Sequence, residues 1–192
     1  MTNRMMPGIF IVVCVAQLLA PVSMIYTHET TLASGKMFKF KTAPVDPADV
    51  FRGKFVALRF EDQEGHGETG VDWASLDEVY ALVEEATDGY AHFTEVLLAP
   101  PEDLDYLRVK VSHTQGSRLS LNIPFDRYYL PEDLAPQAEQ AYREHSRMGN
   151  RDAYVTVVIK DGFGVISNLY LSGQPILEFL RSQNNPEPTA IP

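Results

Sequence analysis

A run of 20 residues without a charged side chain, from Pro7 to Tyr26, constrains the fold of this chain more than any other feature. A helix needs about 20 apolar residues to cross the hydrocarbon core of a bilayer. Gln17 and Pro21 interrupt the apolar character, and spanning helices tolerate both residues. We therefore predict a single uncleaved transmembrane helix. The anchor residues that we single out are Pro7, Phe10, Cys14, Leu18 and Tyr26.

Two other interpretations of this run are a cleaved signal peptide and a buried core helix. The run is longer than the apolar region of a signal peptide, and no A-x-A cleavage site follows it. Arg4 and the amino terminus favour an N-terminus inside the cell, whereas Lys36, Lys39 and Lys41 follow the run. Because long domains are translocated largely regardless of their charge, we expect the remainder of the chain outside.

The composition excludes some classes of partner. The chain has 192 residues and a formal net charge of −10, which disfavours nucleic acid because phosphate binding depends on lysine and arginine. Cys14 is the only cysteine, so neither an internal disulfide nor a CxxC zinc site exists. We predict no cofactor and no metal.

Alternating apolar and polar residues predict strands after the apolar run. The first is 35–41, with Phe38 and Phe40 on one face. The second is 54–60, and three hairpins follow, over 78–98, 106–123 and 153–171. Asp-Gly pairs at the first and third hairpin turns are strong turn signals. A stripe of apolar residues at helical spacing predicts one helix over about 133–148.

These patterns define the fold class as α+β, with mostly antiparallel hairpins and one helix after a single transmembrane helix. The predicted segments are a short tail (1–6), the anchor (7–26), a polar stalk (27–34), a β-rich extracytoplasmic domain (35–181) and a disordered tail (182–192).

One stretch carries a family resemblance. Pro44-Val-Asp-Pro-Ala-Asp49 precedes Arg52-Gly-Lys-Phe-Val-Ala-Leu-Arg-Phe60, shortly after the apolar run. This arrangement resembles the GDYXXLXY proteins, which are bacterial membrane-anchored proteins named for that motif. The chain departs from the motif with Lys54 for Asp and with Phe55 and Phe60 for Tyr. The resemblance continues through Tyr128–Glu132, the predicted helix and the last hairpin.

The resemblance implies a location and an architecture, and it carries no established activity. It implies a single-pass protein of the bacterial inner membrane with its C-terminal domain in the periplasm. Relatives are often encoded beside multi-spanning membrane proteins, which implies that such a protein is a partner. The reversal of charge at Lys54 removes whatever role an aspartate has there in relatives.

No catalytic motif is present: the chain has no GxSxG, P-loop or HExxH sequence. Ser34 and Lys36 follow the apolar run as in a serine/lysine hydrolase, but nothing around them supports that chemistry. The acidic, glycine-rich segment 61–70 is read as a hairpin loop, with a divalent cation site as the alternative.

Six charged residues remain as a candidate interaction surface. They are Asp46, Asp49, Arg52, Arg59, Arg127 and Glu132. They are either charge pairs that hold turns and strands in register or the lining of a binding groove near the membrane. The first function hypothesis is a non-catalytic accessory protein of the cell envelope. The second is a membrane-tethered ligand sensor or hydrolytic enzyme with a site near Asp46, Arg52 and Glu132.

Overall fold

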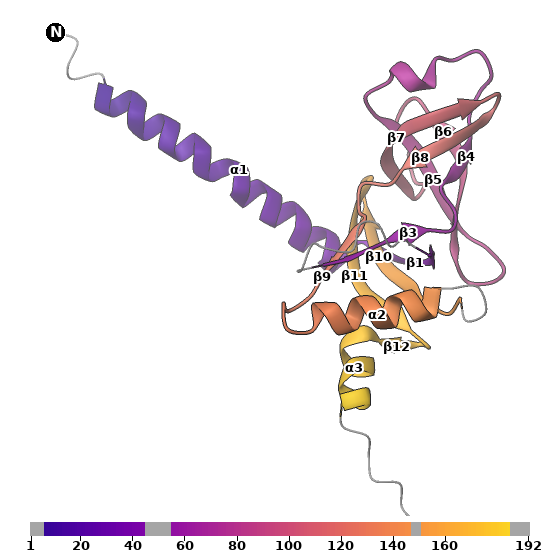
Figure 1. Ribbon diagram of the computed structural model, residues 1–192. Coiled ribbons are helices and arrows are strands. Elements are labelled where there is room, and N and C mark those ends of the chain that lie inside the picture. The colour runs from indigo at the N-terminus through magenta and orange to yellow at the C-terminus, as the bar shows by residue number, and fades with distance from the viewer. Residues whose placement is uncertain (1–5, 45–54, 147–150, 185–192) are drawn as a thin grey trace, which may run out of the picture.

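The computed structural model describes residues 6–44, 55–146 and 151–184. It contains a five-stranded sheet, a five-stranded barrel, a two-stranded ribbon and three α-helices. Figure 1 shows the barrel on one side of the sheet, α2 and α3 on the other, and α1 extending away from both. The elements of the sheet are β1 (Lys36–Ala43), β3 (Arg59–Phe60), β10 (Tyr154–Lys160), β11 (Phe163–Leu171) and β12 (Gln174–Pro175).

The sheet has the strand order β12-β11-β10-β1-β3, and all its neighbouring strands are antiparallel. The predicted alternation of β1 is confirmed, because Phe38 and Phe40 are buried while Lys39 is exposed. The hairpin predicted over 153–171 is also confirmed as β10 and β11, joined at Asp161 and Gly162. β10 is central and is buried on both faces, which explains its nearly continuous apolar sequence.

The barrel closes in the order β4-β6-β5-β7-β8. Its strands are β4 (Glu64–His66), β5 (Val79–Glu85), β6 (Ala91–Leu97), β7 (Tyr106–Gln115) and β8 (Arg118–Asn122). The two hairpins predicted over 78–98 and 106–123 are thus confirmed. The segment 61–70 is not only a loop, because β4 lies within it and closes the barrel by pairing with β6 and β8. A short 3₁₀ helix, η3 (Trp73–Ser75), places the buried Trp73 against the barrel.

The strand predicted over 54–60 is divided into β2 (Phe55–Ala57) and β3. β2 pairs with β9 (Arg127–Tyr129), whereas β3 pairs with β1. Leu58 lies between them, and its backbone N–H donates to the carbonyl of Asp126 at 2.7 Å. Val56, Leu58 and Phe60 are nevertheless all buried. The period-two pattern therefore survives while the segment changes its hydrogen-bonding partner, so this part of the motif joins the ribbon to the sheet.

Two helices pack onto the domain where the sequence predicted one. α2 (Ala135–Ser146) confirms the helix predicted over about 133–148 and buries Ala138 and Tyr142. α3 (Ile176–Asn184) was not predicted. Its apolar stripe consists mainly of the buried Ile176 and Leu180, which is too short to distinguish a helix from a strand by periodicity.

The first helix, α1 (Met6–Ser34), includes the predicted anchor and also the predicted stalk over 27–34. Only its C-terminal end packs on the domain, where Thr31 is buried. Among the residues that the structure describes, no helix combines the length and the apolar character required of a membrane span. The helix predicted over 7–26 is itself confirmed as part of α1.

Candidate functional site

A cleft of about 820 Å³ opens where the edge of the sheet meets the barrel. Its walls come from the end of β1, the segment from β3 to β4, the start of β6, and β7 and β8. The buried side chains Phe40, Phe60 and Leu121 contribute apolar surface, and most of the other lining residues are polar or charged. This volume lies within the range of small-molecule sites, so the cleft is the candidate functional site.

Lys41, at the end of β1, contacts both an acidic and an aromatic side chain at the cleft. The Lys41 ammonium lies 2.7 Å from the Asp88 carboxylate and 4.5 Å from the centre of the Tyr90 ring. The hydrogen bond to Asp88 raises the pKa of Lys41 above its ordinary value, against the opposing effect of desolvation. The same bond and one from the backbone N–H of Tyr90 lower the pKa of Asp88. Both groups therefore remain charged at neutral pH.

Two further side-chain pairs hold the segment between β3 and β4, which forms one wall of the cleft. Nδ1 of His92 in β6 lies 2.9 Å from the carboxylate of Asp62, which precedes β4. The guanidinium of Arg151 lies 3.2 Å from the carboxylate of Glu61. Exposed pairs of this kind contribute at most about 1 kcal/mol each to stability. The first pair links the segment between β3 and β4 to the barrel, and the second links the same segment to the residues that precede β10.

Arg59 is the predicted site residue that lines this cleft. It is exposed and has no acidic partner among the residues that the structure describes. An arginine side chain presents five N–H donors in a planar arrangement that suits carboxylates and phosphates. Arg59 is therefore the cation of the cleft that is best placed to bind an anionic group of a ligand.

Of the other predicted site residues, Arg127 and Glu132 do not line the cleft. Asp46, Asp49 and Arg52 lie outside the described residues. Arg127 lies 3.4 Å from Asp126 and stacks on the Phe55 ring, 5.0 Å from its centre.

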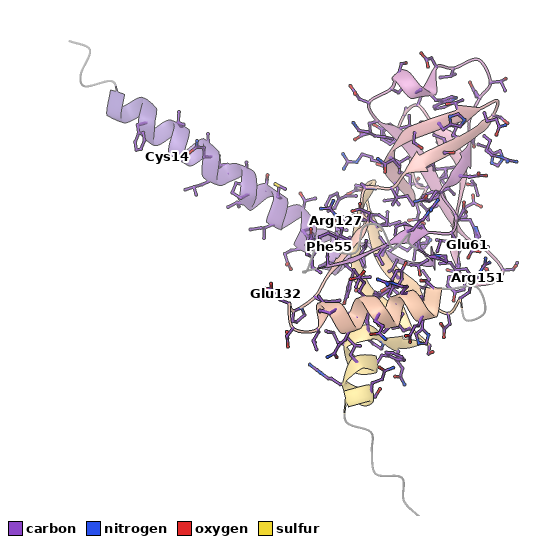
Figure 2. The ribbon with its side chains drawn as sticks, in the orientation of Figure 1. Cys14, Phe55, Glu61, Arg127, Glu132 and Arg151 are labelled. Atoms are coloured by element: carbon purple, nitrogen blue, oxygen red, sulfur yellow. The ribbon has the colours of Figure 1, made fainter. Side chains whose placement is uncertain are left out.

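The last of the predicted residues, Glu132, is exposed in the connection between β9 and α2. Figure 2 shows Arg127 beside Phe55 near the base of α1, and Glu132 at one end of α2. Glu61 and Arg151 lie together on the opposite side of the domain. The structure thus places Arg59 at the cleft and both Arg127 and Glu132 away from it.

A serine, a histidine and an aspartate also meet outside the cleft, at the end of α2. The Ser172 hydroxyl donates to Asp152 at 2.7 Å, and His145 Nδ1 lies 2.8 Å from the same carboxylate. In a catalytic triad the aspartate binds one nitrogen of the histidine and the serine binds the other. Here Ser172 Oγ lies 3.4 Å from Nδ1 of His145, the same nitrogen that faces Asp152. One histidine nitrogen therefore meets both groups, which is not the arrangement of a triad. The cluster instead ties α2 to the start of β10 and the β11–β12 turn.

The described part of the chain contains no group of three histidine, cysteine or acidic side chains arranged to hold a metal ion. Asp62 and Glu64, which were considered as cation ligands, lie on the cleft wall instead.

Sequence reasoning missed most of this cleft. Lys41 and Asp88 are 47 residues apart, and His92 and Asp62 are 30 residues apart. No local spacing links such residues, because the closure of the barrel against the sheet brings them together. The Asp88-Gly89 pair is a local signal, but it predicts a hairpin turn and does not reveal that Asp88 binds Lys41.

Comparison with known proteins yields one match. A model of the family described as "GDYXXLXY protein" matches residues 17–169. No curated protein and no solved structure matches the chain. The matched region includes the motif residues of β2 and β3, the barrel, α2 and most of the β10–β11 hairpin. The chain therefore belongs to the GDYXXLXY family.

Proposed function

We propose that this protein is a membrane-anchored, non-catalytic accessory protein of the bacterial cell envelope. In this proposal α1 crosses the inner membrane once and the β-rich domain lies in the periplasm. The domain binds a partner there, and a multi-spanning protein of the same membrane is the partner that we favour. This assignment agrees with the family to which the chain belongs, for which no activity is established.

The observation that carries the proposal is the exposure of the apolar side chains of α1. Phe10, Leu18, Leu19 and Val22 are between 59% and 68% exposed. At 100° per residue these and the other exposed apolar residues of α1 are distributed around the helix axis rather than along one stripe. A helix that is apolar on all sides is stable in a protein core or in a membrane. The domain covers only its C-terminal end, so a bilayer is the environment that we propose for it.

Fractionation of cells that express the full chain tests the anchor. We expect the protein in the membrane fraction after alkaline carbonate washing. A variant with Leu18→Glu and Val22→Glu is expected to move to the soluble fraction, because two charges in an apolar helix oppose insertion. The matched control is Leu104→Glu with Leu98→Glu, two exposed leucines of the domain, which should stay in the membrane fraction. Release of the unaltered protein by carbonate would reject the anchor.

Reporters fused after the last residue test the orientation. Alkaline phosphatase is active only outside the cytoplasm, so an active fusion is the expected result. A fusion that is inactive, together with a fluorescent cytoplasmic reporter at the same position, would place the domain inside and reject the proposed location.

Photo-crosslinking in intact cells tests the binding role. A photoreactive phenylalanine analogue at Tyr90, which lines the cleft, is expected to capture a membrane protein. The same analogue at Tyr129, which is exposed and does not line the cleft, is the control. Capture of the same partner from both positions would argue against the cleft as the binding surface.

A further inference from the structure

We infer that the tip of the β10–β11 hairpin is a second membrane contact, with Phe163 inserted into the interfacial layer of the bilayer beside α1. This inference rests on the proposed anchoring of α1 and specifies how the domain is held against the lipid surface.

The turn of the hairpin packs against β7 through Gly162 and leaves the ring of Phe163 partly exposed beside it. Asp161 and Gly162 have φ values of 50° and 79°, which is the left-handed conformation of a tight two-residue hairpin turn. Phe163 follows directly and is 37% exposed, and an apolar ring gains no free energy from contact with water. A single exposed apolar residue is common on protein surfaces, so its position relative to α1 decides the argument.

The Phe163 ring lies at the level of the last apolar turn of α1. Phe163 and six residues of α1 line a groove of about 460 Å³ with a mostly apolar surface. The six helix residues are Ser23, Met24, Ile25, Thr27, His28 and Glu29. Two of these helix residues, Met24 and Ile25, are 72% and 63% exposed. The groove is therefore continuous with the apolar surface of the helix, and the medium that covers Met24 and Ile25 also reaches Phe163.

The polar groups at this level suit the boundary between lipid and water. Tyr26 is 70% exposed, and tyrosines concentrate at the headgroup level of membranes. Lys160 precedes the turn, and its ammonium lies 2.7 Å from the hydroxyl of Ser34 in the last turn of α1. An aromatic ring with a lysine behind it matches the interfacial layer, where rings insert and ammonium groups meet phosphates. We therefore assign the groove to phospholipid.

Tryptophan fluorescence in lipid tests this contact. Trp73 is the only tryptophan of the chain and is 2% exposed. Its fluorescence in the unaltered protein should therefore not be quenched by brominated lipid and serves as the background. The purified full chain with Phe163→Trp is placed in phosphatidylcholine nanodiscs that carry bromine near the headgroups or near the bilayer centre. We expect quenching of the new tryptophan, stronger with the shallow bromines, and a shift of its emission to shorter wavelength.

Two control variants separate this inference from the anchor. Leu18→Trp lies within α1, and we expect deep bromines to quench it most. His113→Trp lies on an exposed position of β7 in the barrel and should stay unquenched. If Leu18→Trp is quenched but Phe163→Trp is not, the hairpin contact is wrong and the anchor stands. That result is also the one expected if the groove is reserved for a helix of another protein.

Other outcomes are equally decisive. If Leu18→Trp is not quenched, the anchor itself fails, and the hairpin contact fails with it. If His113→Trp is quenched as strongly as Phe163→Trp, the domain lies on the lipid without preference for the hairpin, which also overturns the inference. Unchanged circular dichroism of the Phe163→Trp variant verifies that the substitution leaves the fold intact.

Discussion

At the residue scale, Phe60 shows that the motif acts through packing. It is 3% exposed, and its ring meets Phe40 and Phe125 edge to face at 5.9 and 5.6 Å. Phe60→Ala should lower the free energy of unfolding by about 3–5 kcal/mol, because it removes a buried ring and leaves a cavity. Urea unfolding followed by Trp73 fluorescence measures this loss. Phe55→Ala, at a half-buried motif position, should cost less, and equal losses would contradict the packing role.

Asp152 makes stability depend on pH. Burial would raise its pKa, but hydrogen bonds from Ser172 and His145 outweigh burial and hold the pKa below the ordinary value of 3.8. The unfolded chain then binds this proton at higher pH than the native chain. The stabilisation is therefore complete above the unfolded pKa and is lost as the pH falls through the native pKa. Between about pH 5 and pH 2 the unaltered protein should lose more stability than Asp152→Asn. Parallel stability curves for the two proteins would contradict this assignment.

At the element scale, two turn glycines differ in what surrounds them. A Cβ on Gly162 would lie 2.5 Å from the Tyr106 ring, whereas a Cβ on Gly116 would meet nothing within 4 Å. Both have positive φ, so alanine at either position costs about 1 kcal/mol in conformational strain. Gly162→Ala should cost clearly more in thermal unfolding, because it also displaces β7 from the hairpin. Equal losses would show that Tyr106 moves aside freely.

The elements that sequence patterns predict are those with local signals. The β10–β11 hairpin combines an apolar run with an Asp-Gly turn, and α2 has a stripe of small and aromatic residues. β4 was missed because its one buried residue is a glycine, so Glu64–His66 shows no apolar alternation. Its partners β6 and β8 are distant in the sequence, so no local turn signal marks the pairing. α3 was missed because its nine residues make only about two and a half helical turns, too few for a clear periodic pattern.

At the scale of the whole molecule, the cleft depends on how two sheets meet, and a single sequence carries no signal for that. The wall residue Arg59 was recognised as a candidate from its charge alone. Its neighbours in the cleft come from β1, β6 and β8, and the barrel order that gathers them includes a parallel β4–β6 pair that no hairpin signal predicts. The apolar surface of α1, in contrast, can be predicted from the uncharged run in the sequence. It stays exposed because only the C-terminal end of the helix meets the domain.

The sheet and the barrel share one hydrophobic core and should therefore unfold together. Phe40 of β1 packs against Phe93 of β6 with ring centres 5.8 Å apart, and both belong to the continuous cluster that includes Val155 and Val79. Hydrogen exchange measured by mass spectrometry should give the same opening free energy for the slowest amides of β5 and β10. Phe93→Ala should lower both values equally, since the lost contact lies between the two units. If β5 exchanged at a lower free energy while β10 kept its protection, the barrel would unfold separately, and the cleft walls would not form one rigid site.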